Sequence, residues 1–144
     1  MGRMTVVGGV LAVLFLLSAC GGGNSPKQRL DKSIHMFNDG VRWKRVNTVT
    51  SYMSIPEADR YTKKQGDFSD DYRILDYEVK SLRLVPEDNA ICVVRFSWLR
   101  LPTNIVQKTT IEQHWVTHEG EWKLKEQKVL RNGKAEKMPA SAPF

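Results

Sequence analysis

The chain has 144 residues, in which 22 lysines and arginines outnumber 16 aspartates and glutamates and give a formal net charge of +6. This length fits one ordinary domain. A basic chain can bind nucleic acid or an anionic membrane surface, or its charges can simply be solvated. The N-terminal segment helps to decide among these.

The N-terminal segment has the pattern of a secretory signal. Residues 1–5 carry the charge of Arg3, and residues 6–17 are apolar apart from two glycines. This apolar stretch is shorter than the roughly 20 apolar residues of a membrane-spanning helix, but it suits a signal peptide. Because an exported chain does not meet nucleic acid, the positive charge predicts a solvated surface or contact with an anionic lipid or polysaccharide.

Leu17-Ser18-Ala19-Cys20 ends this segment and resembles the lipobox of bacterial lipoproteins. The resemblance implies that the signal peptide, residues 1–19, is cleaved between Ala19 and Cys20, and that Cys20 carries the lipid that anchors the chain to a membrane. Gly21 stands where an aspartate would favour the inner membrane, so the resemblance implies an outer-membrane location facing the periplasm. The alternative is an uncleaved anchor, or an ordinary signal peptide with a chance cysteine.

The remaining chain divides into a tether, one folded domain and a tail. Residues 20–26 are rich in glycine and form a flexible tether. Residues 27–130 hold the periodic patterns of a single domain, whereas residues 131–144 have no apolar period and two prolines, which predicts a loose tail. Cys92 lies in an apolar run of the domain, and this predicts a buried, inert thiol.

The first part of the domain is predicted to be helical. Apolar residues recur at the spacing of one helix face between positions 30 and 41, with Pro26 in the first turn and a stop signal at Asn38-Asp39-Gly40. A second helix is predicted over residues 42–53, with Trp43 on its inner side. A third, short helix is predicted to end near residue 66.

The second part of the domain alternates apolar and polar residues as strands do. Four strands are predicted, over residues 72–84, 90–101, 105–117 and 121–130. The first strand changes the parity of its apolar positions between Val79 and Leu82, which indicates a β-bulge. Helices followed by a meander of long strands predict an α+β fold, in which the N-terminal helices pack on an antiparallel sheet of about four strands.

This order of elements resembles the nuclear transport factor 2-like (SnoaL-like) superfamily. The resemblance covers about residues 30–130 and rests on element order, strand length and the sequence W-V-T-H-E-G-E-W-K-L at residues 115–124. It implies a curved, cone-shaped sheet with a pocket beneath the helices, and an outer sheet face that often forms a dimer interface. Some members are isomerases, cyclases or dehydratases, whereas many only bind ligands or dimerise. Cystatin-like folds and other helix-plus-meander arrangements are the competing interpretations.

The reactive side chains favour binding over catalysis. The histidines His35, His114 and His118 share no helical face and no metal-ligand spacing, so no metal ion or other cofactor is expected. Asp76 is the best candidate for a general base, but its side chain points away from the apolar neighbours on its strand, which favours a solvated carboxylate. His35 lies off the apolar stripe of its helix and is expected to face solvent.

Candidate pocket-lining residues are the aromatic and amide side chains Tyr52, Tyr61, Trp98, Gln113 and Trp115. The two tyrosines could line a pocket mouth, and Gln113 could hydrogen-bond a ligand from among apolar neighbours. Ordinary packing in the core is the alternative explanation for each of these side chains.

Arg42-Trp43-Lys44-Arg45 is a basic cluster around one aromatic residue. Contact with an anionic membrane or glycan surface is one interpretation of it. The interpretation that the pattern favours is a helix with Trp43 inward and the charges outward.

These patterns together predict a membrane-anchored periplasmic lipoprotein whose domain is not an enzyme. The partners expected for it are the membrane through the lipid on Cys20, and a hydrophobic small ligand or an envelope protein, with a homodimer as a further option. The alternatives are a small pocket enzyme of isomerase or hydratase type, and a structural component of the cell envelope.

Overall fold

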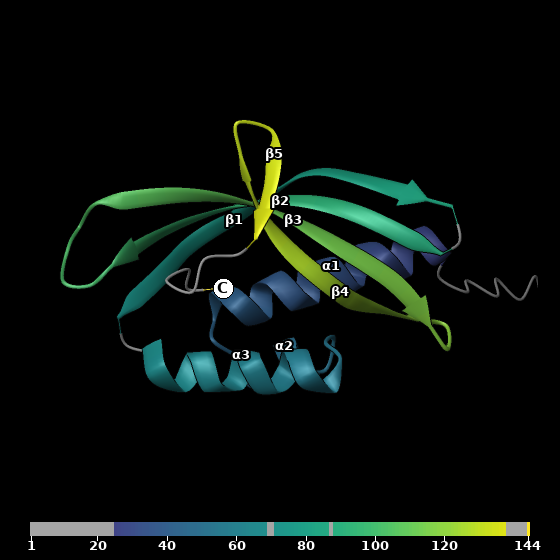
Figure 1. The fold of residues 1–144 in the computed structure, drawn as a ribbon, viewed down its shortest axis with the longest axis horizontal. Helices are drawn as coiled ribbons and strands as arrows, with labels where there is room; N and C mark the ends of the chain where they lie inside the picture. Colours follow the sequence, from purple (N-terminus) through teal and green to yellow (C-terminus); the bar gives the residue numbers. More distant parts are fainter. Residues whose placement is uncertain (1–24, 69–70, 87, 138–143) are drawn as a thin grey trace, which may run out of the picture.

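The computed structural model describes residues 25–68, 71–86, 88–137 and 144, so the predictions for residues 1–24, including the cleavage site and Cys20, lie outside it. Within these ranges three helices precede five strands (Figure 1). They are α1 (Pro26–Arg42), α2 (Val46–Thr50), α3 (Ile55–Phe68), β1 (Tyr72–Val85), β2 (Asn89–Arg100), β3 (Val106–His118), β4 (Glu121–Arg131) and β5 (Lys134–Lys137). In this described part, no helix is long and apolar enough to cross a bilayer.

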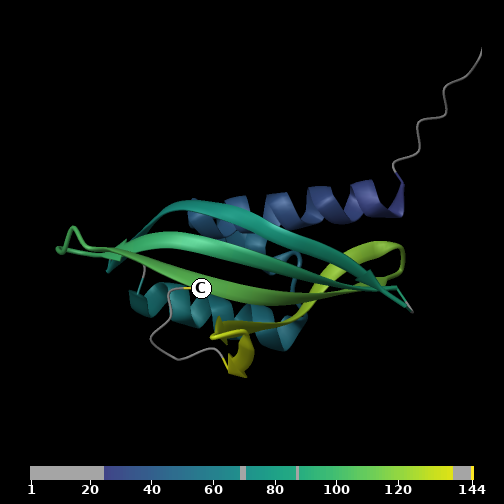
Figure 2. The same ribbon diagram turned by 90° about the horizontal axis from the view of Figure 1, so that it is seen from above.

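The strands form one antiparallel sheet in chain order, β1-β2-β3-β4-β5. Figures 1 and 2 show that the sheet is curved and that the helices lie on its concave side. The predicted α+β arrangement of helices on a curved antiparallel sheet is therefore confirmed, with a fifth strand added to the predicted four.

Helix α1 begins with a capping box at Ser25. The Ser25 hydroxyl accepts a hydrogen bond from the Gln28 N–H at 3.2 Å, and the Gln28 side-chain oxygen accepts one from the Ser25 N–H at 2.8 Å. Pro26 occupies the first turn, where its missing N–H costs no hydrogen bond. The predicted apolar stripe of this helix is buried against the sheet and consists of Leu30, Ile34, Phe37 and Val41.

The predicted stop at Asn38-Asp39-Gly40 is wrong, because α1 continues to Arg42. Asn38 turns inward, and its Nδ2 atom donates to the carbonyl oxygen of Ile34 at 2.8 Å. Gly40 allows α2 to approach closely, since a Cβ atom at this position would lie 2.9 Å from Cγ2 of Val49. Residues that often end helices are thus used here for packing inside one.

The predicted second helix is reduced to the five residues of α2. The break falls at Lys44, whose φ of 54° is incompatible with a continuous right-handed helix. The expectation that Trp43 faces inward is also wrong, because its side chain is 59% exposed. Val49 is buried, and α3 ends at Phe68, close to the predicted end near residue 66.

The predicted strands agree with β1 to β4 to within one residue at each end. Strand β1 contains the predicted bulge, seen as a register shift between Val79 and Ser81, and a second shift between Ile74 and Asp76 that was not predicted. The two bulges keep apolar side chains of β1 on the concave face, because Tyr77 pairs with Phe96 before the second shift and Leu82 pairs with Cys92 after it.

The core lies between the helices and the concave face of the sheet. Trp115 is fully buried there and meets the ring of Phe37 edge-on at 5.5 Å and that of Tyr52 at 6.0 Å, both measured between ring centroids. The predicted burial of Cys92 is confirmed, and burial raises the pKa of its thiol to about 12. All the described core residues lie between positions 30 and 144, so residues 21–144 contain the whole described core.

The stretch that was expected to be a loose tail contains structure. Asn132 and Gly133, with φ of 51° and 76°, make the tight turn that joins β4 to β5. Asn-Gly is a strong hairpin signal, because both residues tolerate positive φ, and the expectation of a loose tail overlooked it. Phe144 is 5% exposed and belongs to the core cluster.

Candidate functional site

A cavity of about 360 Å³ lies between helix α3 and strand β4. Its wall on the helix side consists of Glu57, Arg60, Tyr61 and Lys64, and its wall on the sheet side consists of Leu124, Lys125, Glu126 and Gln127. Met53, Lys137 and Phe144 complete the lining. We take this cavity as the candidate functional site, because it adjoins the apolar core and carries several charged groups.

Local structure explains why so many polar side chains reach this cavity. The four residues from α3 are spaced three, one and three apart, which is one face of a helix. On the sheet side, a register shift in the β3–β4 pairing makes Trp115 pair with Leu124 but His114 with Glu126. The extra residue at this bulge is Lys125, and the bulge allows four consecutive residues of β4 to border the cavity instead of alternate ones.

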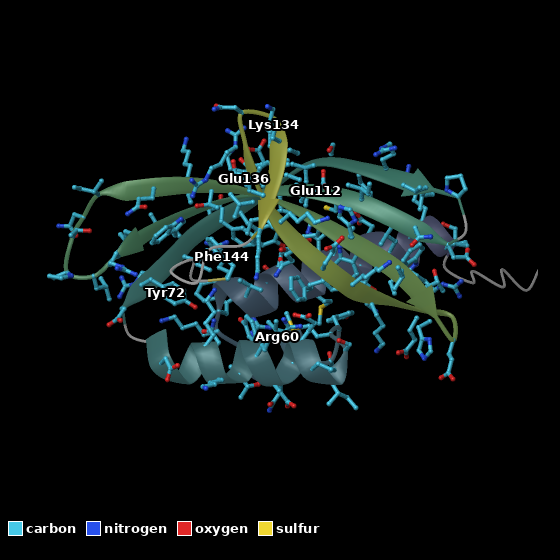
Figure 3. All side chains as sticks on the ribbon, in the orientation of Figure 1. Arg60, Tyr72, Glu112, Lys134, Glu136 and Phe144 are labelled. Carbon is cyan, nitrogen blue, oxygen red and sulfur yellow. The ribbon has the colours of Figure 1, made fainter. Side chains whose placement is uncertain are left out.

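Phe144 is a buried residue in the lining of the cavity. Its ring stacks on that of Phe96, with centroids 4.7 Å apart and planes at 28°, and it meets Trp98 edge-on at 6.1 Å. The Lys64 ammonium donates a hydrogen bond to a main-chain oxygen of Phe144 at 3.0 Å. Figure 3 shows Phe144 between the strands and helix α3, which carries Arg60. We call the space between the rings of Phe96 and Trp98 the aromatic slot. The ring of Phe144 fills it, and the main-chain oxygen of Phe144 accepts from Lys64 beside it.

Tyr61 adds a buried hydroxyl group to the cavity wall. The residue is 5% exposed, and its hydroxyl makes no hydrogen bond with any residue that the structure describes. Burial raises the pKa of Tyr61 well above its ordinary value, so the phenol is neutral at physiological pH. Its neighbour Tyr72, by contrast, donates to the buried Gln65 at 2.8 Å. An unsatisfied donor of this kind is suited to a polar atom of a ligand.

The charged groups of the cavity are partly paired. Arg60 forms an ion pair with Glu57 on the same helix. Glu126 accepts a hydrogen bond from Lys128, which lowers the pKa of the Glu126 carboxyl. Burial lowers the pKa of Lys64 below its ordinary value. Glu57 and Glu126 are thus paired with Arg60 and Lys128, whereas the Lys64 ammonium contacts the oxygen of Phe144 beside the aromatic slot.

A buried amide network connects the cavity to α1. Nε2 of Gln113 donates to Oδ1 of Asn38 at 2.8 Å and to Oε1 of Gln127 at 3.1 Å. Asn38 and Gln113 are fully buried, and Gln127 lines the cavity. The network leaves each of these buried amides with a partner and fixes the orientation of Gln127.

The structure separates the predicted pocket-lining residues. Tyr61 lines the cavity, whereas Tyr52 lines a different hollow near the β3–β4 turn. Trp98, Gln113 and Trp115 are buried in the core, where Trp98 donates from Nε1 to the hydroxyl of Thr109 at 2.9 Å.

Sequence reasoning missed Arg60, Lys64 and Phe144 as lining residues. For the two cations, the helical spacing of residues 57, 60, 61 and 64 was the available signal. Phe144 had no signal of its own beyond being a lone aromatic residue in a polar stretch.

The other candidate groups lie away from the cavity. The side chain of His35 is half exposed and its Nδ1 atom lies 3.1 Å from the Tyr77 hydroxyl, and Asp76 is exposed and accepts from Arg42 at 3.1 Å. Both therefore face solvent as predicted. His114 lies on the outer sheet face, with Nε2 2.6 Å from Glu112. Across residues 25–137, masked positions aside, no cluster of side chains is suited to holding a metal ion.

Comparison with known proteins places the fold. No protein-family model and no curated protein sequence matches the chain. Among solved structures, a nuclear transport factor 2-like protein of unknown function from Shewanella oneidensis has a TM-score of 0.57 and 9% identity, over 72% of this chain and 97% of that one.

Two further solved structures share the arrangement. A domain of unknown function with a cystatin-like fold from Nostoc punctiforme has a TM-score of 0.56 and 11% identity, over 73% of this chain and 76% of that one. A protein assigned as a polyketide cyclase from Xanthomonas campestris has a TM-score of 0.53 and 8% identity, over 75% and 93%. At these identities the likeness shows the fold alone, which is the nuclear transport factor 2-like α+β cone.

Proposed function

We propose that this chain is a membrane-anchored lipoprotein whose domain binds a small amphipathic anion in the cavity between α3 and β4 and does not transform it. The ligand class is an apolar ring system that carries an acidic group. The observation that carries this proposal is the placement of Phe144, whose ring occupies the aromatic slot while its main-chain oxygen accepts from Lys64 at 3.0 Å.

Phe144 indicates which chemistry the slot accepts. A planar ring that displaced it would find the same faces of Phe96 and Trp98, and an acidic group on that ring would find the Lys64 ammonium. The unpartnered hydroxyl of Tyr61 could donate to a second oxygen of the same ligand. A single Phe side chain held by the chain is a modest competitor, since burying it contributes about 1.5–3 kcal/mol.

Pairing of the carboxylates favours binding over proton transfer. A general base requires a carboxylate whose pKa is raised towards neutral. The pKa of Glu126 is instead lowered by its hydrogen bond to Lys128, and Glu57 is held by Arg60. Glu126 therefore lacks the environment of a general base.

A pocket enzyme is the second candidate function, and Lys64 is the observation that favours it. An amine whose pKa is lowered by burial is the usual requirement for a lysine that acts as a base or nucleophile, and Tyr61 could act beside it as a proton donor. A protein of similar fold has been assigned as a polyketide cyclase, and this assignment is compatible with an enzyme on this scaffold. Reaction of the protein with a carbonyl compound and borohydride, giving a reduced adduct on Lys64, would favour this candidate.

The anchor is proposed from the sequence Leu17-Ser18-Ala19-Cys20. We infer attachment to the outer membrane with the domain in the periplasm, where the ligand or an envelope protein would be met. Replacing Cys20 by Ser should abolish incorporation of labelled fatty acid and leave the precursor uncleaved. Continued lipid labelling of the Cys20→Ser chain would contradict the anchor, whatever the cavity binds.

Native mass spectrometry of residues 21–144 purified from a periplasm tests the binding proposal. A protein mass with one added small molecule is expected. A bare monomer would count against a resident ligand, and a dimer or a complex with an envelope protein would favour an assembly role instead. Release from cell walls only at high salt would favour a structural envelope component.

Titration with 1-anilinonaphthalene-8-sulfonate, an aromatic anion, provides a probe of the same site. Lys64→Gln is expected to weaken its binding about tenfold, which corresponds to about 1.4 kcal/mol. Lys63→Gln is the matched control, because Lys63 is the exposed neighbour on the same helix. Equal affinities of the two variants would contradict the assigned role of Lys64.

A further inference from the structure

A second feature, unrelated to the cavity, gathers apolar side chains at one end of the domain. Seven large apolar side chains of the described residues are exposed, and four of them are Trp43 at 59%, Leu101 at 41%, Ile105 at 71% and Val106 at 51%. Trp43 directly follows α1, and the others belong to the connection between β2 and β3 and the start of β3. We call these four residues the Trp43 end.

The Trp43 end is held together by the start of β1. Trp43 and Leu101 line the same surface hollow, together with Tyr72. The Leu101 N–H donates to the carbonyl oxygen of Asp71 at 2.8 Å, which ties the β2–β3 connection to the residue before β1. Figure 1 shows this connection protruding at the end of the molecule where β1 begins. The exposed apolar groups therefore belong to one end of the fold and not to scattered surface sites.

Positive charge surrounds these apolar groups. Arg42, Lys44 and Arg73 line the same hollow as Trp43 and Leu101. Arg45 and Arg100 lie next to these residues in the sequence. The Arg42 guanidinium lies 5.0 Å from the centroid of the Trp43 ring, and the Lys44 ammonium lies 4.6 Å from that of Tyr72. Asp76 accepts from Arg42, and Asp71 also lies nearby, so the acidic groups only partly offset the excess of cations.

We propose that the Trp43 end contacts the surface of a membrane that contains anionic phospholipid. Indole rings prefer the headgroup level of a bilayer, and aliphatic side chains at the tip of a loop can enter the acyl boundary. Lysines and arginines around them bind headgroup phosphates and gain from the negative surface potential.

This contact would be a second one, remote from the lipid on Cys20. Helix α1 has 17 residues and is therefore about 25 Å long, with the chain from Cys20 arriving at its first residue and Trp43 following its last. Contacts at both ends would hold α1 along the membrane surface and the domain on its side. The inference depends neither on the cavity nor on acylation, so it can be tested without either.

The tryptophans of the chain provide the measurement. All four lie in the described ranges, and Trp98, Trp115 and Trp122 are at most 8% exposed, so Trp43 is the tryptophan that solvent reaches. Residues 21–144, without lipid, are mixed with vesicles of phosphatidylcholine containing phosphatidylglycerol, or with vesicles of phosphatidylcholine alone. We expect a blue shift of the emission and quenching by brominated acyl chains with the anionic vesicles only, both reversed by high salt.

Two variants distinguish the proposed contact from non-specific binding of exposed apolar side chains to vesicles. Trp43→Ala is expected to weaken vesicle binding about tenfold. Ile55→Ala is the matched control, because Ile55 is 80% exposed but begins α3, away from the Trp43 end, and it should bind as the unaltered chain does. Circular dichroism checks that both variants keep the fold.

Three results would overturn the proposal. They are the absence of vesicle binding, equal binding to the two kinds of vesicle, and an unchanged affinity of Trp43→Ala. If the protein does not bind vesicles but forms a dimer that Trp43→Ala dissociates, the Trp43 end would be an interface with a second copy of the chain. None of these outcomes bears on ligand binding in the cavity.

Discussion

The concave face of the sheet is filled in one region and open in another. Beneath α1 and α2 it is closed by Phe37 and Trp115, which are fully buried, and by the amides Asn38 and Gln113, which bond to each other. Beneath α3 the facing helix residues are largely charged, and a cavity of about 360 Å³ remains, with Phe144 in its lining. One sheet thus has a closed region that stabilises the fold and an open region with a cavity, in which we propose that a ligand binds.

The largest effect is expected in the closed region. Trp115→Ala should lower the free energy of unfolding by about 3–5 kcal/mol, because it removes a fully buried ring and leaves a cavity that its neighbours cannot fill. Urea denaturation measures this value. Trp43→Ala, at the exposed tryptophan, is the control and should change the same free energy by less than about 0.5 kcal/mol.

A loss for Trp115→Ala no greater than that for the exposed tryptophan would show that the closed region is not the stabilising one. The comparison between the two regions would then fail.

The amide network should show a smaller and partly reversible effect. Gln113→Leu leaves the fully buried Asn38 without its side-chain partner and should cost about 1–3 kcal/mol in urea denaturation. Adding Asn38→Leu removes the stranded amide, so the double variant should regain part of that loss. Additive losses would show that the two amides act independently.

Alkaline pH should destabilise the domain through Cys92. Burial holds the pKa of its thiol at about 12 in the folded chain, against an ordinary value of 9.0. The neutral thiol therefore contributes its full stabilisation below about pH 9. Above about pH 9 only the unfolded chain ionises, so the free energy of unfolding should fall by up to about 1.4 kcal/mol per pH unit. The raised pKa values of Tyr61 and Tyr72 act in the same direction above about pH 10.

Denaturation midpoints recorded between about pH 8 and 11 test this expectation, and Cys92→Ala should flatten the fall between about pH 9 and 10. If the denaturation midpoint falls equally steeply with pH in Cys92→Ala and in the unaltered chain, another group causes the loss of stability.

A smaller effect on stability than that of Trp115→Ala is expected in the open region. Phe144→Ala should cost about 1–2 kcal/mol, because the ring is buried but the site already adjoins a cavity, and the released chain regains conformational entropy. The same change should increase the affinity for 1-anilinonaphthalene-8-sulfonate, since the aromatic slot becomes free. A loss as large as that for Trp115→Ala, with no gain in probe binding, would show that Phe144 is an ordinary core residue.

Much of the fold followed from local patterns. The alternation of apolar residues predicted β1 to β4, and a parity change between Val79 and Leu82 predicted one bulge. The second bulge, near Asp76, moves the inward positions from Ile74 to Tyr77, but Leu75 is also apolar, so the sequence shows an unbroken alternation from Leu75 onwards. The break before α2 falls at Lys44, whose residue type rarely signals positive φ. The periodicity of residues 42–53 therefore predicted an inward Trp43 that the structure exposes.

The candidate site was less accessible to such reasoning. Tyr61 was identified among possible pocket residues, but Lys64 and Phe144 are 80 positions apart and meet only through the fold. Charged residues on one helix face usually indicate a solvated surface. Here that face borders a cavity, because the bulge at Lys125 in β4 turns four consecutive residues towards α3.

The sequence by itself determined the elements whose signal is local: the start of α1 at Pro26, the four long strands and the burial of Cys92. These follow from hydrogen bonds and side-chain periods within a few residues. Only the tertiary structure decided that Gly40 continues a helix, that Trp43 is exposed and that Phe144 lies beside Lys64. Each of these depends on a group that is distant in the chain or on a backbone angle that residue type does not specify, and packing in three dimensions settles both.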